Sequence, residues 1–305
     1  MQMPSAFLAL SLALAAQDTS AVLDDVVVTA PPLTPEVARS YVDRIANPPL
    51  RALSLATWRT PVCLLVENLA PEAKSIVSAR IVARAENLGI KVGEGCRPNL
   101  VVVFTSDGSA TATDLVSAIP TLFRLKAGEP QGDRHELAVF ETTTAPVRWW
   151  TMSGDYSTYR GAFLTPTHGE DSQFGLSSDQ NGSAPMRAAD PGEIYSNQSQ
   201  VRAIIRSTVV VDTRQTGGVS TEALADYIAM VALAEVDPEA DTQKFPTILN
   251  LWDGQADLPA MTTWDWAYLK GLYKAEIRIS GSISPVRSRF QLNEIARSMA
   301  GDRTP

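Results

Sequence analysis

The chain has 305 residues, which is enough for one large domain or two modest ones. Its hydrophobic content of 45% and charged content of 20% are typical of a globular protein with a sizeable core. The net charge is −8 and no local run of Lys or Arg offsets it, which argues against nucleic acid or an anionic membrane surface as partner.

The first residues have the pattern of a secretory signal. An apolar stretch that ends at Ala16 is too short to span a bilayer, and Ala13 and Ala15 supply a small-x-small cleavage site. We therefore expect residues 1–16 to be a signal peptide and residues 17–33 to be a flexible N-terminal segment. There is no second long apolar run and no cysteine beside the cleavage site for a lipid anchor. The sequence thus predicts a periplasmic or secreted protein without stable membrane insertion.

Within the N-terminal segment, DDVVVTAPP at 24–32 resembles the short stretch with which many TonB-dependent outer-membrane receptors pair, as an added strand, with their energising partner. No β-barrel pattern follows, so the chain is not itself such a receptor. Strand addition needs only main-chain hydrogen bonds and pockets for alternate side chains. Residues 24–32 are therefore either a docking strand for an envelope protein or a tail or edge strand of the domain.

From residue 34 onwards the pattern predicts one α+β domain that continues to residue 305. Thr34 followed by Pro35 is typical of a helix start, and the NPP triplet at 47–49 ends that helix. Compact apolar runs predict strands, whereas apolar residues with helical periodicity predict helices. The expected strands are 61–69, 99–107, 136–144, 146–155 and 207–212, and the expected helices are 35–46, 71–89, 112–124, 223–237, 263–275 and 288–300.

The segment from 61 to 107 has the order strand, helix, strand, with Gly89 as the helix stop. This order is a βαβ unit, in which a right-handed crossover joins two parallel strands. Together with the later strands it predicts a mixed sheet packed against helices. In the last helix, we expect Phe290, Leu292, Ile295 and Met299 to point inward.

The two cysteines, Cys63 and Cys96, lie near the starts of the two strands of this unit. Parallel neighbours bring both residues to the same edge of the sheet, where the distance between their Cα atoms can suit a disulfide. An even cysteine count in a secreted chain favours pairing, which would stabilise the fold by about 3–4 kcal/mol. The alternative is a pair of buried free thiols.

Residues 165–200 have little periodicity and many turn-forming residues. A loop of this length is uncommon in a compact domain, so we expect a lid, a binding loop or a disordered insert. His168 lies in it beside Glu170 and Asp171, either as a general base with its orienting acid or as a solvated histidine. The other histidine, His135, suggests no site.

The apolar helix at 223–237 follows the strand STVVVD and precedes TTWDWAYLKGLY. This order of elements resembles that of zincin-like metallopeptidases, in particular secreted families of Gram-negative bacteria. The resemblance covers residues 200–275 and implies a zincin-like core. The matching residues are Val209, Val210, Val211 and Asp212 in the strand, and Thr262, Asp265, Leu269, Leu272 and Tyr273 in the later helix.

The zinc motif of that family, HExxH, would fall on Asp226, Tyr227 and Met230. The motif works because two histidines share one helix face and the glutamate between them activates the bound water. A carboxylate can bind zinc, but a thioether is a poor ligand and a phenol is no general base near neutral pH. We therefore exclude a zinc peptidase of the usual kind, expect neither metal nor cofactor, and expect this helix to belong to the core.

Trp149 and Trp150 are adjacent on an expected strand and must point to opposite faces. One of them could thus be exposed as a stacking platform for a sugar or peptide ring, and core packing is the alternative. Paired carboxylates could support a hydrolase, but acids are so abundant around the central helices that no particular pair stands out.

Three functions remain open. The first is a secreted, non-catalytic pseudo-metallopeptidase that binds a peptide or an envelope protein in the old substrate groove. The second is a metal-independent hydrolase that uses carboxylates or His168, and the third is an envelope accessory that docks through residues 24–32. A groove filled by apolar side chains favours the first, whereas clustered polar side chains with a perturbed carboxylate in a cleft favour the second.

Overall fold

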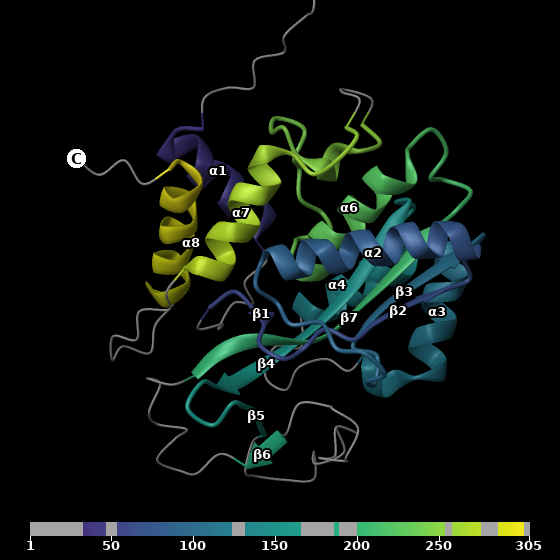
Figure 1. Ribbon diagram of the computed structural model, residues 1–305, viewed down its shortest axis with the longest axis horizontal. Helices are drawn as coiled ribbons and strands as arrows, with labels where there is room; N and C mark the ends of the chain where they lie inside the picture. Colours follow the sequence, from purple (N-terminus) through teal and green to yellow (C-terminus); the bar gives the residue numbers. More distant parts are fainter. Residues whose placement is uncertain are drawn as a thin grey trace, which may run out of the picture. The chain divides into compact units, whose positions relative to one another are not determined.

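The computed structural model describes residues 33–46, 54–123, 132–165, 186–188, 200–253, 258–275 and 286–301. They form an α+β fold in which helices pack on a mixed sheet, as the sequence predicts (Figure 1). The expected signal peptide, the expected docking strand 24–32 and His168 lie outside the described residues.

The sheet has seven strands within the described ranges, in the order β2–β3–β7–β4–β5–β6, with β1 paired to β7. Strands β2, β3 and β7 are parallel, and β4 runs antiparallel to β7 along its length. Two strands pair with the same edge of the central strand β7: β1 with its first half and β3 with its second half. The bounds are β1 Thr57–Trp58, β2 Leu64–Glu67, β3 Leu100–Thr105, β4 Val147–Ser157, β5 Ala162–Thr165, β6 Met186–Ala188 and β7 Gln200–Asp212.

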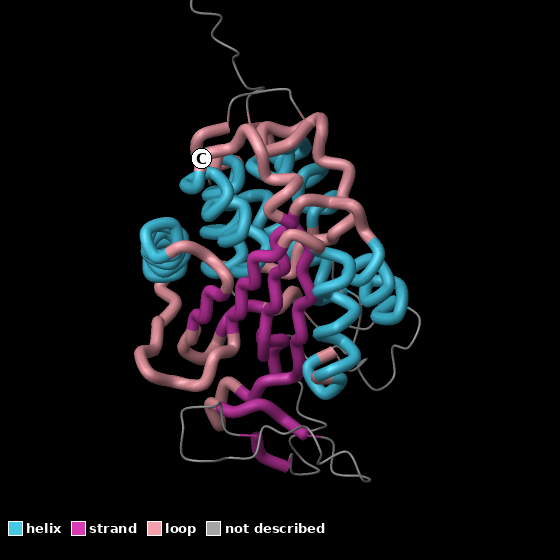
Figure 2. The backbone as a smooth tube through the Cα atoms, turned by 90° about the vertical axis from the view of Figure 1, so that its right-hand side faces the viewer, coloured by secondary structure: helices cyan, strands magenta, loops and turns pink. Residues whose placement is uncertain are grey.

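Helices cover both faces of the sheet, and each face has its own apolar core (Figures 1 and 2). Val209 and Val211 of β7 face the larger core, formed with α1, α2, α6, α7 and α8, whereas Val210 faces a smaller core formed with α3 and α4. The bounds are α1 Pro35–Ile45, α2 Pro71–Asn87, α3 Gly108–Ala118, α4 Gly132–Thr142, α6 Thr221–Leu233, α7 Thr263–Lys274 and α8 Val286–Met299, with short 3₁₀ turns η1 at Pro120–Leu122 and η2 at Ile248–Asn250.

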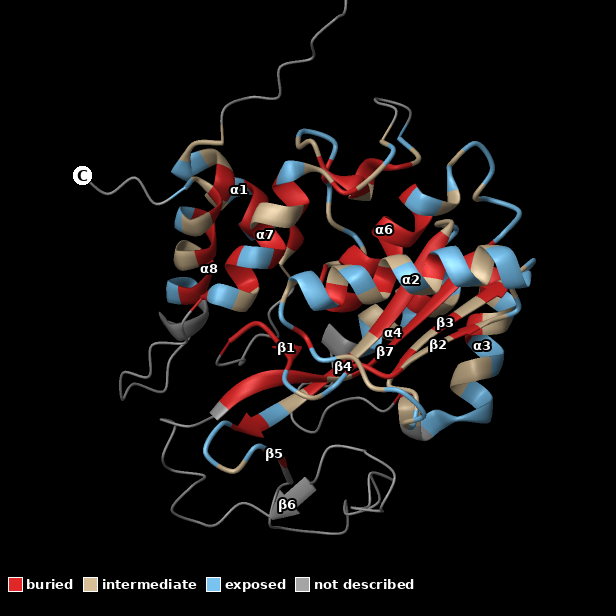
Figure 3. Cartoon of the chain, in the orientation of Figure 1, coloured by how far each residue is buried: buried red, intermediate tan, exposed pale blue. Residues whose placement is uncertain are grey.

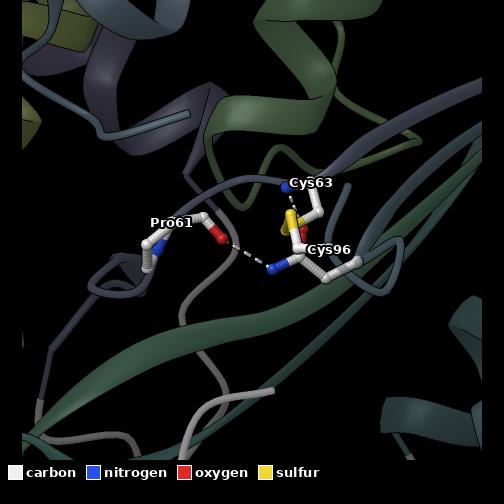
Figure 4. The surroundings of a disulfide bond; sticks show 4 residues. Pro61, Cys63 and Cys96 are labelled. Atoms are coloured by element: carbon white, nitrogen blue, oxygen red, sulfur yellow. Dashed lines mark hydrogen bonds between the residues drawn. A yellow bond between two sulfur atoms is a disulfide. The ribbon is translucent and has the colours of Figure 1, made fainter. Parts of the chain in front are cut away.

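Strands β2 and β3 with helix α2 form the expected βαβ unit. Its two strands begin beside the Cys63–Cys96 disulfide, whose Cα atoms are 5.9 Å apart (Figure 4). Asn99 strengthens the same edge, because its side chain accepts a hydrogen bond from the main-chain N–H of Cys63 at 2.7 Å and donates one to the carbonyl of Pro61 at 2.9 Å. The predicted pairing of the two cysteines is confirmed.

Local signals at the helix ends also behave as predicted. The Thr34 side chain accepts a hydrogen bond from the main chain of Val37 at the start of α1. Gly89 follows the end of α2 with φ of 75°, a conformation that glycine adopts without steric cost. Thr262 and Asp265 form a capping box at the start of α7.

The expected strand at 136–144 is wrong, because residues from Gly132 to Thr142 form helix α4. Its short apolar run LAVF cannot be assigned to helix or strand by periodicity alone. The helix is selected by tertiary packing: Phe140 is buried and stacks on Phe123 with ring centroids 5.5 Å apart. His135 therefore lies on a helix, with Nε2 2.6 Å from a carboxylate oxygen of Glu239 at the surface.

The expected loop at 165–200 lies between β5 and β7, but the strand that follows it is longer than expected. A short strand, β6, lies within it, and β7 begins at Gln200, seven positions before the expected start at Ser207. The first half of β7 carries Arg202 and Arg206. Because strands were predicted from runs of apolar residues, these two charged residues caused the first half of β7 to be missed. Both arginines are buried in the structure.

The expected inward face of the last helix is correct at three of its four positions. Leu292, Ile295 and Met299 are buried, whereas the side chain of Phe290 is 58% exposed. Position 290 lies off the buried row that runs through 292, 295, 296 and 299. No helix in the described ranges is long and apolar enough to cross a membrane.

Replacing both cysteines (Cys63→Ala with Cys96→Ala) should lower the free energy of unfolding by about 4 kcal/mol, because the bridge closes a loop between residues 33 positions apart. Urea denaturation with and without reductant measures this change. Reductant should destabilise the wild type and leave the double variant unaffected. Equal stability of the oxidised wild type and the double variant would contradict the prediction.

Candidate functional site

Helix α6 occupies the position at which the resemblance predicts a metal-binding helix, and it is a core helix. Ser220 caps its first turn by accepting a hydrogen bond from the main chain of Ala223 at 3.1 Å. Every residue from Ala223 to Leu233 is buried, because α2 covers the helix on one side and the sheet lies beneath it (Figure 3). The helix therefore packs within the main apolar core.

Asp226 on this helix is fully buried and accepts five hydrogen bonds. Arg80 donates to its two oxygens at 2.9 and 2.9 Å, and Arg84 donates to the same oxygens at 2.7 and 2.9 Å. The main-chain N–H of Met261 supplies the fifth bond at 2.8 Å. A carboxylate offers about four lone-pair sites, so these donors leave no free site for a metal ion.

The two arginines also determine the charge state of Asp226. Burial alone would raise its pKa, but the hydrogen bonds from Arg84 and Arg80 hold the pKa below its usual range. The carboxyl group is therefore ionised at neutral pH and cannot act as a general acid. Since two guanidinium groups face one carboxylate, the cluster keeps an excess of one positive charge.

The other two positions at which the resemblance would place the zinc motif are equally unsuited to metal chemistry. Tyr227 is buried, and this burial raises the pKa of its phenol well above the usual value. Its ring packs against Trp252 and Trp149 with centroid distances of 4.8 and 6.3 Å. Met230 is 0% exposed within the main core. Across the described ranges, no group of three or more His, Cys, Asp or Glu side chains could hold a metal ion.

Two further buried carboxylates near α6 have structural partners. Glu235 accepts hydrogen bonds from the side chain of Ser153 and from the main chain of Ala56, and its carboxylate lies 3.8 Å from the guanidinium of Arg202. These contacts join the end of α6 to strands β4 and β7.

The second buried carboxylate is that of Asp265 on α7. It accepts hydrogen bonds from Tyr41 at 3.0 Å, from Thr247 at 2.5 Å and from main-chain and side-chain donors that include Thr262. Burial raises the pKa of Asp265, and the hydrogen bonds that it accepts oppose that rise. The carboxylate fastens α1, η2 and the start of α7 together and does not open onto a cleft.

The tryptophans at 149 and 150 point to opposite faces of β4, as expected, but both are buried. Trp149 donates its indole N–H to the carbonyl of Val236 at 3.0 Å. Neither ring is an exposed stacking platform, because helices cover both faces of the sheet. Core packing, the alternative left open by the sequence, is what the structure shows.

The surface beside the Asp226 cluster carries a pocket between α2, α7 and α8. Helix α7 contributes one face to it, formed by Thr263, Trp266, Ala267, Lys270 and Lys274. Asn87 from the end of α2 and Ser298 from α8 complete the walls. Gly271 on α7 allows this arrangement, because a Cβ atom there would lie 3.2 Å from the backbone and side chain of Ile295 on α8.

Arg84 connects this pocket to the buried cluster. Its guanidinium carbon lies 5.0 Å from the ring centroid of Trp266, while its nitrogens bind Asp226. The ammonium group of Lys270 lies 5.6 Å from the same ring. Both distances are typical of cation–π contacts. The pocket is thus built around a half-buried tryptophan and positive charge.

Sequence reasoning missed the arginines and this pocket, although one signal for the arginines was present. Arg80 and Arg84 are four residues apart on α2 and lie on the same face. Like charges at that spacing repel, so a facing carboxylate is expected. The spacing does not identify which carboxylate it is, since α6 is 142 residues distant from Arg84 in sequence.

Replacing Asp226 by asparagine should lower the free energy of unfolding by about 3 kcal/mol at neutral pH, because two guanidinium groups lose their buried counter-charge. The pKa of Asp226 is lowered in the folded state, so its contribution is complete above the unfolded value of about 3.9 and is lost as pH falls through the folded pKa. Urea titrations between pH 3 and 7 should show the two proteins converging at the acid end.

The matched control is Asp114→Asn, which removes one negative charge from an exposed position on α3. This control should change stability by less than about 0.5 kcal/mol. Equal effects of the two substitutions, or a difference that does not depend on pH, would contradict the assigned role of Asp226.

Comparison with known protein families, with curated protein sequences and with solved structures finds no match to this chain. The account of its function therefore depends on the geometry of α6, its arginine partners and the adjacent pocket.

Proposed function

We propose that this chain is a secreted or periplasmic, non-catalytic binding protein, with a zincin-like core in which the metal-binding positions have become structural. In this proposal its ligand is a peptide or a segment of an envelope protein. The observation that supports the proposal is the position of Arg84, which binds the buried Asp226 and also contacts Trp266, a residue that lines an open pocket.

The contacts of Asp226 argue against a catalytic role. A carboxylate can serve a metal or a proton transfer only if it has a free lone pair or a pKa near the working pH. Asp226 has neither, because five donors occupy its oxygens and its pKa is lowered. Since α6 is buried under α2 and the loop that contains Met261, substrate has no path to the positions of the old motif.

The pocket between α2, α7 and α8 supports a binding role. A pocket with a partly exposed aromatic ring and several polar groups is the usual form of a recognition site. The α2–α7–α8 pocket has these features and lies one side chain away from the position of the former metal helix. In this proposal the ligand binds at the pocket between α2, α7 and α8, and not at α6, because the residues of α6 are buried.

A location outside the cytoplasm is supported by the disulfide. The bond between Cys63 and Cys96 joins the segments that lead into β2 and β3, and such bonds persist in oxidising compartments. The signal-like pattern of residues 1–16 is consistent with the same location.

Elemental analysis of the purified chain after incubation with zinc, calcium and manganese should find well below one equivalent of each metal. A quenched fluorescent peptide library should also remain uncut. One equivalent of zinc together with peptide hydrolysis that is abolished by Asp226→Asn would contradict the non-catalytic part of the proposal.

The binding part is tested separately with an immobilised random peptide library displayed on phage. We expect enrichment of a shared sequence pattern on the wild-type chain, with saturable binding of synthetic copies. Absence of any saturable peptide, whatever its composition, would contradict the proposed binding function.

A further inference from the structure

We propose that the α2–α7–α8 pocket binds an extended acidic peptide with the alternating pattern apolar–x–acid–x–acid. The apolar side chain lies on Trp266, and the two carboxylates pair with Lys270 and Lys274. This inference rests on the proposed binding function and specifies its ligand.

The shape of the pocket favours an elongated ligand. Its α7 face extends from Thr263 to Lys274, a helical rise of about 16 Å at 1.5 Å per residue. An extended peptide of about five residues spans the same length at 3.3 Å per residue. A small inorganic anion would contact only one end of such a surface.

The spacing of the side chains matches one side of an extended strand. Trp266, Lys270 and Lys274 follow one another at intervals of four residues, which is about 6 Å along the helix axis. Alternate side chains of an extended peptide point to the same side and recur about every 6.6 Å. Three successive same-side residues of the ligand therefore lie opposite these three residues.

The charges of the pocket call for acids in the ligand. Lys270 and Lys274 are both exposed, and in the described part of the chain no carboxylate oxygen lies within 4 Å of either ammonium group. The guanidinium of Arg84 lies beside the same tryptophan ring and is paired with the buried Asp226. This surface is cationic on a chain whose net charge is −8.

Trp266 supplies the apolar contact. It is half-buried, and Arg84 holds its position in the free protein through the contact described above. The ammonium group of Lys270 also rests near its ring, on a flexible and exposed side chain. When a ligand carboxylate pairs with Lys270, that side chain can move off the ring, which then accepts an aromatic or aliphatic side chain of the ligand.

The probe is a fluorescein-labelled peptide with the sequence Gly-Phe-Gly-Glu-Gly-Glu-Gly, titrated into the full chain and followed by fluorescence anisotropy. Two comparison peptides keep its length. In one, both glutamates are replaced by glutamine; in the other, the glutamates are adjacent, so that their side chains point to opposite sides of an extended chain. We expect saturable binding of the probe, and at least tenfold weaker binding of each comparison peptide.

The protein variants reverse the two charges. Lys270→Glu combined with Lys274→Glu should weaken binding of the probe at least tenfold and should fold normally, because both side chains are exposed. The matched control combines Lys244→Glu with Arg134→Glu, which changes the net charge equally at exposed positions outside the pocket. The control should change binding by less than twofold.

Several results would overturn the proposal. These are no saturable binding of the probe, equal weakening by the two double variants, and equal binding of the alternating and adjacent peptides. Competition by citrate or inorganic phosphate as effective as by the unlabelled probe would likewise overturn it, since the pocket would then be a site for small anions. If the phage library yields binders of another pattern while the probe fails, this inference is wrong and the proposed binding function stands.

Discussion

The structure depends on one buried carboxylate that is shared by two arginines. Asp226 joins α6 to α2 through Arg80 and Arg84, and through the main chain of Met261 it also holds the segment that leads into α7. Three elements distant in sequence are thus fixed at a single point above the sheet. Because an unpaired charge in the interior costs several kcal/mol, the arrangement of the helical layer is tied to the presence of all three side chains.

This ion cluster also connects the interior of the protein to its surface. The guanidinium of Arg84 binds Asp226, and its central carbon lies 5.0 Å from the ring centroid of Trp266, so a buried interaction also positions a residue of the exposed pocket. Arginine suits this role better than lysine because its planar group can donate in its own plane and stack at the same time. The contact with Arg84 thus holds the Trp266 ring at a defined place beside the pocket.

Local sequence signals predicted much of the fold and little of the site. The βαβ unit, the disulfide within it, the burial of α6 and the cap at Thr34 follow from patterns in nearby stretches of the sequence. Helix α4 was assigned wrongly because its short apolar run fits a strand as well as a helix, and its Phe140 packs on Phe123 of another segment. The first part of β7 was missed because it carries Arg202 and Arg206, which are buried in the fold. The pairing of Arg84 with Asp226 and the meeting of Asn87, Lys270 and Ser298 depend on the packing of three helices, which no spacing in the sequence encodes.

The disulfide edge has a consequence beyond the stability of one molecule. Strand β2 lies at the end of the sheet, and such strands can recruit a second chain through their free main-chain groups. Here Val62 donates its N–H to the carbonyl of Lys91 and accepts from the N–H of Gly93, so the segment just before Cys96 covers the first part of that edge. By holding this segment in place, the bridge between Cys63 and Cys96 keeps the main-chain groups of Val62 paired within the molecule and closed to a second chain.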